Sequence, residues 1–163
     1  MSFFRMSFSP SEIPRELWDA YRRTEYWIEM PSPPAEPVKP RKLRLCLRVD
    51  EDAAGLTCGL PGLPDLLKIP WAYLTAWNPR SAPETESVNR ARQSELEKRL
   101  NRDGILCLPG VARDPLGRWP DEEGLLAMGL ERGRALQLGK EFGQNAILTG
   151  VGEGKIALES CQD

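Results

Sequence analysis

The order of strand-like and helix-like segments between residues 71 and 149 restricts the folds that this chain can adopt. Alternating apolar residues predict strands, apolar residues at helical spacing predict helices, and Gly and Pro mark the ends of both. The predicted order is strand, helix, strand, strand, helix, strand, which is the split βαβ order of a ferredoxin-like core. The predicted strands cover 71–77, 105–108, 124–130 and 145–149, and the predicted helices cover 81–103 and 131–142.

Residues at the ends of these segments support the boundaries. Ser81 and Glu84 have the spacing of a capping box, which predicts that the first of the two helices begins at Ser81. Gly104 is a typical residue for ending that helix. Turn residues occur throughout 109–119, so we expect this segment to be a loop.

Segments outside this core are expected to extend the same sheet. Alternating apolar residues predict strands at 24–30 and 43–49, antiparallel to each other. Residues 155–158 are expected to form a closing hairpin with the strand before them. A short helix is expected to begin at Ser11, which places Pro14 in its first turn.

The fold class follows from these elements. We expect 1–163 to form a single α+β domain with a mostly antiparallel sheet, two main helices and a ferredoxin-like core with added strands. The segment at about 31–41 contains five prolines and is expected to be a stiff, solvated loop.

Composition and charge argue against several classes of protein. The 163 residues suit one domain, since domains usually hold about 100–200 residues. A net charge of −2 argues against a nucleic-acid partner, because such proteins usually carry a basic excess. No apolar run approaches the roughly 20 residues that span a bilayer, and no signal peptide is evident, so we expect a cytoplasmic protein without a membrane partner.

Histidine is absent, and the four cysteines are far apart in the sequence, at Cys46, Cys58, Cys107 and Cys161. Zinc and redox sites usually need closely spaced cysteines, often with histidines, so no metal site is expected. Without histidine the chain also lacks Ser–His and Cys–His nucleophile pairs. Glycine-rich phosphate-binding and dinucleotide-binding motifs are absent too, and we expect no cofactor.

Trp77, Asn78 and Arg80 form the first candidate site, where a strand ends and a helix is about to begin. Asparagine before proline favours extended or turn geometry, which points its side chain away from the sheet. Free amide hydrogens at a helix N-terminus suit an anion or a carbonyl group, and Arg80 would add a cationic group there. The alternative is a structural Asx-turn with a surface arginine.

Asn89 is a polar residue on the apolar face of the following helix, beside Leu96 and Leu100. A buried amide without partners costs about 1–3 kcal/mol. We therefore expect Asn89 either to brace the turn at Asn78 or to point into a pocket. The neighbouring Arg90 and Arg92 are expected on a solvated face.

Two further groups of residues could contribute to a site. Trp119 and Trp77 would stack on a planar ligand, and Glu122 close to Trp119 would act as a general acid or base if its pKa were raised. Gln144 and Asn145 follow a helix end and offer uncharged donors and acceptors. A solvated acidic run, an aromatic residue at the edge of the core and capping of the helix end are the structural alternatives. Four amide side chains are expected to converge in one region: Asn78, Asn89, Gln144 and Asn145.

Four pieces of the sequence carry a resemblance to a known family. They are 73–81 (Tyr-Leu-Thr-Ala-Trp-Asn-Pro-Arg-Ser), Asn89 with Leu96 and Leu100, Trp119 with Glu122, and 142–146 (Phe-Gly-Gln-Asn-Ala). With these residues the chain resembles the bacterial domain of unknown function 3293 family over roughly residues 21–149. The resemblance implies a bacterial, cytoplasmic protein and indicates which residues to test, but it implies no activity.

The leading hypothesis is a small binding domain for a polar ligand that is nucleotide-like or carries a carboxylate. The residues assigned to its site are Trp77, Asn78, Arg80, Asn89, Trp119, Glu122, Gln144 and Asn145. Two alternatives stay open. One is an enzyme that uses Glu122 as general acid or base, and the other is a protein-interaction or regulatory module that presents Trp27 and the prolines.

Overall fold

The computed structural model describes residues 12–31, 43–58, 60 and 65–162, and the statements below concern these residues. Their α-helices are α1 (Arg15–Arg23), α2 (Glu86–Arg102) and α3 (Arg132–Glu141). Their strands are β1 (Glu25–Met30), β2 (Leu43–Leu47), β3 (Pro70–Leu74), β4 (Leu106–Arg113), β5 (Glu122–Met128), β6 (Ala146–Val151) and β7 (Ala157–Ser160). Two short 3₁₀ helices are η1 (Leu66–Lys68) and η2 (Pro79–Ser81).

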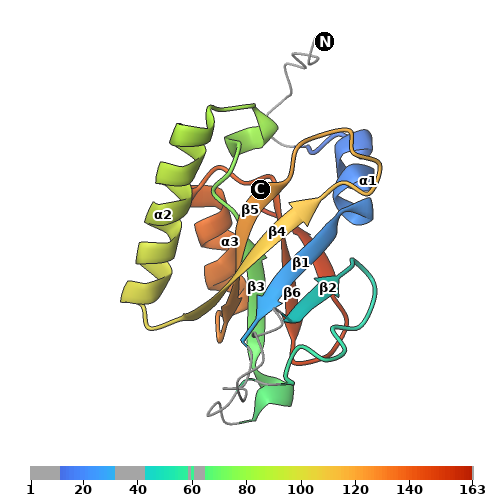
Figure 1. Cartoon of the computed structure of the whole chain (residues 1–163), viewed down its shortest axis with the longest axis vertical. Coiled ribbons are helices and arrows are strands. Elements are labelled where there is room, and N and C mark those ends of the chain that lie inside the picture. Colours follow the sequence, from blue (N-terminus) through green and yellow to red (C-terminus); the bar gives the residue numbers. More distant parts are fainter. Residues whose placement is uncertain (1–11, 32–42, 59, 61–64, 163) are drawn as a thin grey trace, which may run out of the picture.

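The seven described strands form one antiparallel sheet in the order β2-β1-β4-β5-β3-β6-β7 (Figure 1). Helices α2 and α3 lie side by side against the sheet, and α1 lies apart from them, next to β1 (Figure 1). The predicted α+β class, the mostly antiparallel sheet and the two main helices are confirmed. The ferredoxin-like description of the core and the assignment of 1–163 to one domain stay predictions. None of the described helices has the length and apolar character needed to cross a membrane.

The loop predicted at 109–119 is wrong over its first part. Strand β4 continues to Arg113, and β5 begins at Glu122, so the two strands pair over seven residues. The Pro109-Gly110 pair has the sequence of a turn, yet it lies within β4. Strand β4 pairs with β1 only from Gly110 to Arg113, so Pro109 lies outside that ladder. Pro109 therefore needs no N–H for that ladder, and a proline is tolerated at this position.

The predicted starts of two helices also need correction. Helix α2 begins at Glu86, and its N-cap is Thr85, whose hydroxyl accepts a hydrogen bond from the Val88 amide at 3.3 Å. The capping box predicted at Ser81 is wrong, because Ser81 has a left-handed backbone with a φ of 56°. Helix α1 begins at Arg15. Its expected start, Ser11, lies outside the described residues, as does the Pro-rich segment apart from residue 31.

The sheet separates two apolar cores. Helices α2 and α3 cover one face, where Leu96, Leu100 and Leu138 are buried. On the other face Ile28 and Leu126 are fully buried in a second core, which also contains Tyr73. Each fully buried apolar side chain of this size contributes about 1.5–3 kcal/mol. Because side chains alternate along a strand, Tyr73 of β3 and the even-numbered residues of β5, Glu122 included, face the same side.

Two glycines make room for Tyr73 in the second core. Gly110 of β4 and Gly124 of β5 are cross-strand partners. A Cβ atom added at Gly110 would lie 2.8 Å from the Tyr73 ring, and one at Gly124 would collide with the Tyr73 ring and hydroxyl. The Tyr73 ring therefore occupies the space that side chains at positions 110 and 124 would otherwise fill. It packs directly on the backbone of β4 and β5, which fixes its position.

We predict that Gly124→Ala destabilises the protein by about 1–3 kcal/mol, because the added methyl group overpacks the buried ring of Tyr73. Gly133→Ala is the control, since its Cβ meets no atom within 4 Å and alanine favours the helix that contains it. Chemical denaturation of both variants measures the difference. An unchanged free energy of unfolding in Gly124→Ala would show that Tyr73 is not held as described.

Candidate functional site

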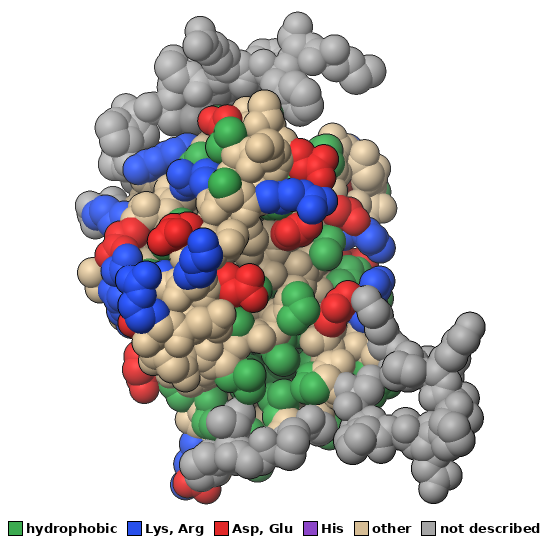
Figure 2. Space-filling view, turned by 60° about the vertical axis from the view of Figure 1, so that its left-hand side comes forward, with side chains coloured by type: hydrophobic (Ala, Val, Ile, Leu, Met, Phe, Trp, Pro, Cys, Tyr) green, Lys and Arg blue, Asp and Glu red, His purple; other side chains and the backbone are tan. Residues whose placement is uncertain are grey.

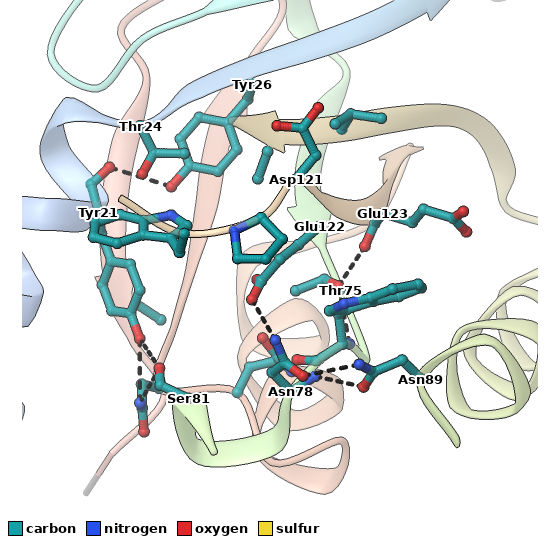
Figure 3. A pocket seen from close by; sticks show the side chains of 18 of the residues that line it. Tyr21, Thr24, Tyr26, Thr75, Asn78, Ser81, Asn89, Asp121, Glu122 and Glu123 are labelled. Carbon is teal, nitrogen blue, oxygen red and sulfur yellow. Dashed lines mark hydrogen bonds between the residues drawn. The ribbon is translucent and has the colours of Figure 1, made fainter. Parts of the chain in front are cut away.

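A cavity of about 820 Å³ lies at one end of the sheet, bordered by the end of β3, the start of β5 and helix α1 (Figure 3). Seven of the eight predicted site residues line it: Trp77, Asn78, Asn89, Trp119, Glu122, Gln144 and Asn145. Arg80 is not among the lining residues. Its side chain is exposed, and Nη1 donates a hydrogen bond to Gln162 Oε1 at 3.4 Å.

The turn after β3 has an unusual backbone. Strand β3 ends at Leu74 and not at residue 77 as predicted. Asn78, Arg80 and Ser81 have φ values of 42°, 57° and 56°, in the left-handed region. Such a backbone costs a residue other than glycine roughly 1–3 kcal/mol, and it persists only where the surrounding structure enforces it. Of the two geometries expected for Asn78, the structure shows the turn.

Asn89 braces this turn through reciprocal hydrogen bonds with Asn78 (Figure 3). The Asn89 Oδ1 atom accepts a hydrogen bond from the Asn78 backbone N–H, and Asn89 Nδ2 donates to Asn78 Oδ1, both at 2.8 Å. Asn78 Oδ1 also accepts from the Glu84 amide at 3.0 Å. The Asn89 side chain is 2% exposed, so its burial is as predicted and its amide is bonded to the turn.

Helix α2 supplies two more supports that the sequence analysis did not identify. Gln93 lies one helical turn after Asn89, and its Oε1 accepts a hydrogen bond from the Ala76 amide at 2.8 Å. Arg92 donates to the Ala76 carbonyl at 3.1 Å and to the Phe142 carbonyl at 2.7 Å. The solvated position expected for Arg92 is therefore wrong. The i, i+4 spacing of Gln93 from Asn89 is the signal that could have identified it.

Gln144 and Asn145 hold the same turn from the other side. Gln144 Nε2 donates to the Trp77 carbonyl at 3.2 Å. Asn145 Nδ2 lies 3.2 Å from both the Ser81 and the Tyr21 hydroxyl oxygens. The four predicted amide side chains thus lie in one region, and each bonds within the protein. Their role as ligand-binding groups stays a prediction.

Glu122 projects toward the same turn from the start of β5 (Figure 3). Its Oε1 atom accepts a hydrogen bond from Asn78 Nδ2 at 2.8 Å. Burial raises the pKa of the Glu122 carboxyl above its usual value, and the hydrogen bond from Asn78 opposes this only in part. The pKa of this carboxyl therefore lies closer to neutral pH than the pKa of a solvated glutamate, which suits a group that donates or accepts a proton.

Three tyrosines that were not predicted as site residues line the cavity: Tyr21, Tyr26 and Tyr73. The Tyr21 hydroxyl is hydrogen-bonded to the Ser81 hydroxyl at 2.7 Å. The Tyr26 hydroxyl donates to the Tyr21 carbonyl at 3.2 Å, and its ring packs edge-to-face on Tyr73 with centroids 5.1 Å apart. Burial raises the pKa of all three hydroxyls, which are therefore uncharged at neutral pH.

The Tyr73 hydroxyl differs from the other two because it has no hydrogen-bond partner in the described part of the chain. The residue is 3% exposed. A buried hydroxyl without a partner costs about 1–3 kcal/mol, and phenylalanine would fill the same space without that cost.

Acidic side chains outnumber basic ones among the residues that line the cavity. Glu84 lies just before α2 and Glu86 is its first residue, and Asp121 and Glu123 flank Glu122. Of the basic residues only Arg90 is among the described lining residues. The whole chain is nearly balanced, with 24 acidic and 22 basic residues, and both signs lie side by side on the face in Figure 2. The acidic excess is therefore a local property of the cavity.

Ion pairs offset part of this acidic charge. Arg90 pairs with Glu86 at 2.7 Å, as expected for an exposed arginine, and Arg113 pairs with Asp121 at 2.7 Å. Two of the amide hydrogens expected to be free before α2 already have partners within the protein. Asn78 Oδ1 binds the Glu84 amide, and the Thr85 hydroxyl binds the Val88 amide.

Trp119 lies at the edge of the cavity and is half-buried. The Arg118 guanidinium lies 5.2 Å from the Trp119 ring centroid, within the range of a cation–π contact. Within the described ranges no group of three or more His, Cys, Asp or Glu side chains is arranged to hold a metal ion. The expectation of no bound metal stays a prediction.

Residues 74–147 match the model of a family described as "Protein of unknown function (DUF3293)". The match confirms the resemblance to this family. The matched range contains all eight predicted site residues, whereas Tyr73 lies just outside it. No curated protein and no solved structure matches the chain.

We predict that Asn89→Leu lowers the melting temperature. Leucine would continue the apolar face of α2, but the substitution leaves the backbone N–H and the amide of Asn78 without their partner, which costs about 1–3 kcal/mol. Asn101→Leu, an exposed position on the same helix, is the control and should change stability by less than about 0.5 kcal/mol. A melting temperature of Asn89→Leu at or above that of the wild type would contradict the bracing role.

We predict that Glu122→Gln stabilises the protein at neutral pH. The folded-state pKa of this carboxyl is raised, so the ionised form opposes folding at every pH above that pKa, and the penalty disappears as the pH falls below the unfolded-state pKa. Glutamine keeps the acceptor for Asn78 Nδ2. The gain in melting temperature should therefore be largest near neutrality and should vanish at about pH 3.5.

The matched control for that experiment is Glu123→Gln, the exposed next residue. Melting temperatures of the three proteins across the acidic range provide the test. A gain in Glu122→Gln that does not depend on pH, or an equal gain in Glu123→Gln, would show that burial of the Glu122 carboxyl is not its cause.

Proposed function

We propose that this chain binds a small, largely apolar ligand in the cavity between α1, β3 and β5. The observation that carries the proposal is the Glu122 carboxyl, which is partly buried at the edge of an apolar core and has its pKa raised by burial. Burying a carboxyl costs free energy that an apolar residue at the same position would avoid. The position of Glu122 therefore does not help the protein to fold, which points to a role in binding. Perturbed carboxyls in concave sites are typical of functional sites.

The size and the composition of the cavity support the same proposal. Small-molecule sites usually have volumes of about 300–1,000 Å³ and apolar walls with a few convergent polar groups, and this cavity of about 820 Å³ has both features. Its apolar wall includes Leu17, Leu148 and Leu158, and Trp119 offers a flat aromatic surface.

The charge around the cavity refines the class of ligand. Glu84, Glu122 and Glu123 line it and have no basic partner among the described residues. Like charges repel more strongly where water is partly excluded. A neutral or cationic ligand is therefore favoured, and a carboxylate, one of the ligands considered from the sequence, is disfavoured.

An enzyme is the second candidate, and the raised pKa of Glu122 is the observation that favours it. Conversion of a bound compound, followed by NMR over hours, would support this candidate. Glu122→Gln should then stop conversion while the compound still binds.

Saturation-transfer NMR with neutral, cationic and anionic aromatic fragments tests binding. We predict that neutral and cationic fragments bind the wild type, and that Leu17→Trp, which fills the cavity from α1, weakens them at least about tenfold. Leu67→Trp is the control, because Leu67 is 68% exposed and does not line the cavity. The absence of any binding at millimolar concentration, or binding that Leu17→Trp leaves unchanged, would refute the proposal.

A further inference from the structure

We infer that the cavity recognises an uncharged amide-like edge, in which a hydrogen-bond acceptor lies beside an N–H donor, as in lactams, primary amides and nucleobases. Tyr73 would donate to the acceptor, and Glu122 would accept from the N–H group. This inference rests on the proposed function and specifies the chemistry of its ligand.

The Tyr73 hydroxyl supplies the donor. Tyr73 lines the cavity, and its hydroxyl is buried and has no hydrogen-bond partner in the described part of the chain. Gly110 and Gly124 lie directly beneath the ring, and Tyr26 packs against it, so the ring is held in place. Buried polar groups are usually hydrogen-bonded, and a ligand acceptor that reaches this hydroxyl from the cavity supplies the partner that the described residues do not.

Glu122 supplies the acceptor. One carboxylate oxygen accepts the hydrogen bond from Asn78 Nδ2, and no hydrogen bond joins the other oxygen to a described residue. That bond also fixes the direction of the carboxyl group, because Asn78 is itself held by Asn89. A carboxylate oxygen is an acceptor and calls for an N–H or O–H donor on the ligand.

The two groups lie on one face of the sheet at a spacing that suits a single small molecule. The Tyr73 hydroxyl lies at the position of a Gly124 side chain, and Glu122 is two residues from Gly124 along β5. Two residues of a strand span about 7 Å. These neighbouring positions on one face place both groups within reach of one small molecule.

Tyr73 and Glu122 together disfavour ligands that carry other hydrogen-bonding groups. A carboxylate ligand carries two acceptors and a negative charge, and it would face the Glu122 carboxylate without a donor. A simple amine satisfies Glu122 but leaves the Tyr73 hydroxyl without an acceptor. An amide edge satisfies both, and Trp119 can lie against its flat ring.

The test uses four probes of similar size: 2-pyridone with both groups of the edge, toluene with neither, benzylamine with a cation only, and benzoate with a carboxylate. Dissociation constants are measured by NMR titration for the wild type, Tyr73→Phe, Glu122→Gln and Tyr26→Phe. We expect 2-pyridone to bind the wild type most tightly. Tyr73→Phe should weaken it about 3- to 10-fold, and Glu122→Gln should weaken it about tenfold or more, while toluene binding stays within about twofold in both variants.

Tyr26→Phe is the matched control. It also removes a tyrosine hydroxyl from the wall of the cavity, but this hydroxyl already donates to the Tyr21 carbonyl. We expect Tyr26→Phe to lower the melting temperature and to leave 2-pyridone binding within about twofold. Tyr73→Phe should keep or raise the melting temperature, because it removes a hydroxyl that bonds to no described residue.

The outcomes separate this inference from the proposed function. If no probe binds, toluene included, both are overturned. If toluene binds in the cavity but 2-pyridone has no advantage over it, or benzoate binds more tightly, only the amide-edge inference is overturned. A melting temperature that falls in Tyr73→Phe would show that the protein itself satisfies this hydroxyl, and would overturn the inference too.

Discussion

The reciprocal pair of hydrogen bonds between Asn78 and Asn89 is the interaction on which the candidate site depends. Asn89 is fixed because α2 is anchored by Leu96 and Leu100 in the core. It holds both the backbone and the side chain of Asn78, and so it stabilises a left-handed conformation that would otherwise relax. The Asn78 side-chain Nδ2 then donates to Glu122 Oε1, so a helix on one side of the sheet positions a carboxyl on the other.

The site combines groups that are costly for folding with a scaffold that is mostly satisfied, since among the supporting amides only Gln93 Nε2 is buried without a partner among the described residues. The amides of Asn89, Gln144 and Asn145 all bond within the protein, and the turn they support is held from α2 and from the loop between α3 and β6. In contrast, Glu122 loses hydration and Tyr73 keeps a hydroxyl without a partner among the described residues. Rigid support beneath a few unsatisfied groups is the arrangement expected of a preorganised binding site.

The sequence predicted the α+β class and the order of elements, because burial of apolar faces leaves a local periodic pattern. Asn89 was identifiable for the same reason, as an amide that interrupts an apolar face. Tyr73 could not be identified in this way, because the sequence pattern of a buried tyrosine does not show whether its hydroxyl is hydrogen-bonded. The position of the Tyr73 hydroxyl depends on Gly110 and Gly124, which are distant in the sequence. Pairing of β4 with β5 likewise overrode the local turn signal of Pro109-Gly110, and the N-cap shifted to Thr85 because the turn before it is left-handed.

The contact of Tyr73 with Gly110 and Gly124 also constrains how this protein can evolve. A side chain at position 124 is disfavoured while position 73 carries a large ring, so the effects of substitutions at these positions depend on one another and their order matters. The glycines change at least cost after a smaller residue has appeared at 73. An intermediate of that kind would lose the ring before anything replaced it, so we expect the three residues to be retained or replaced together.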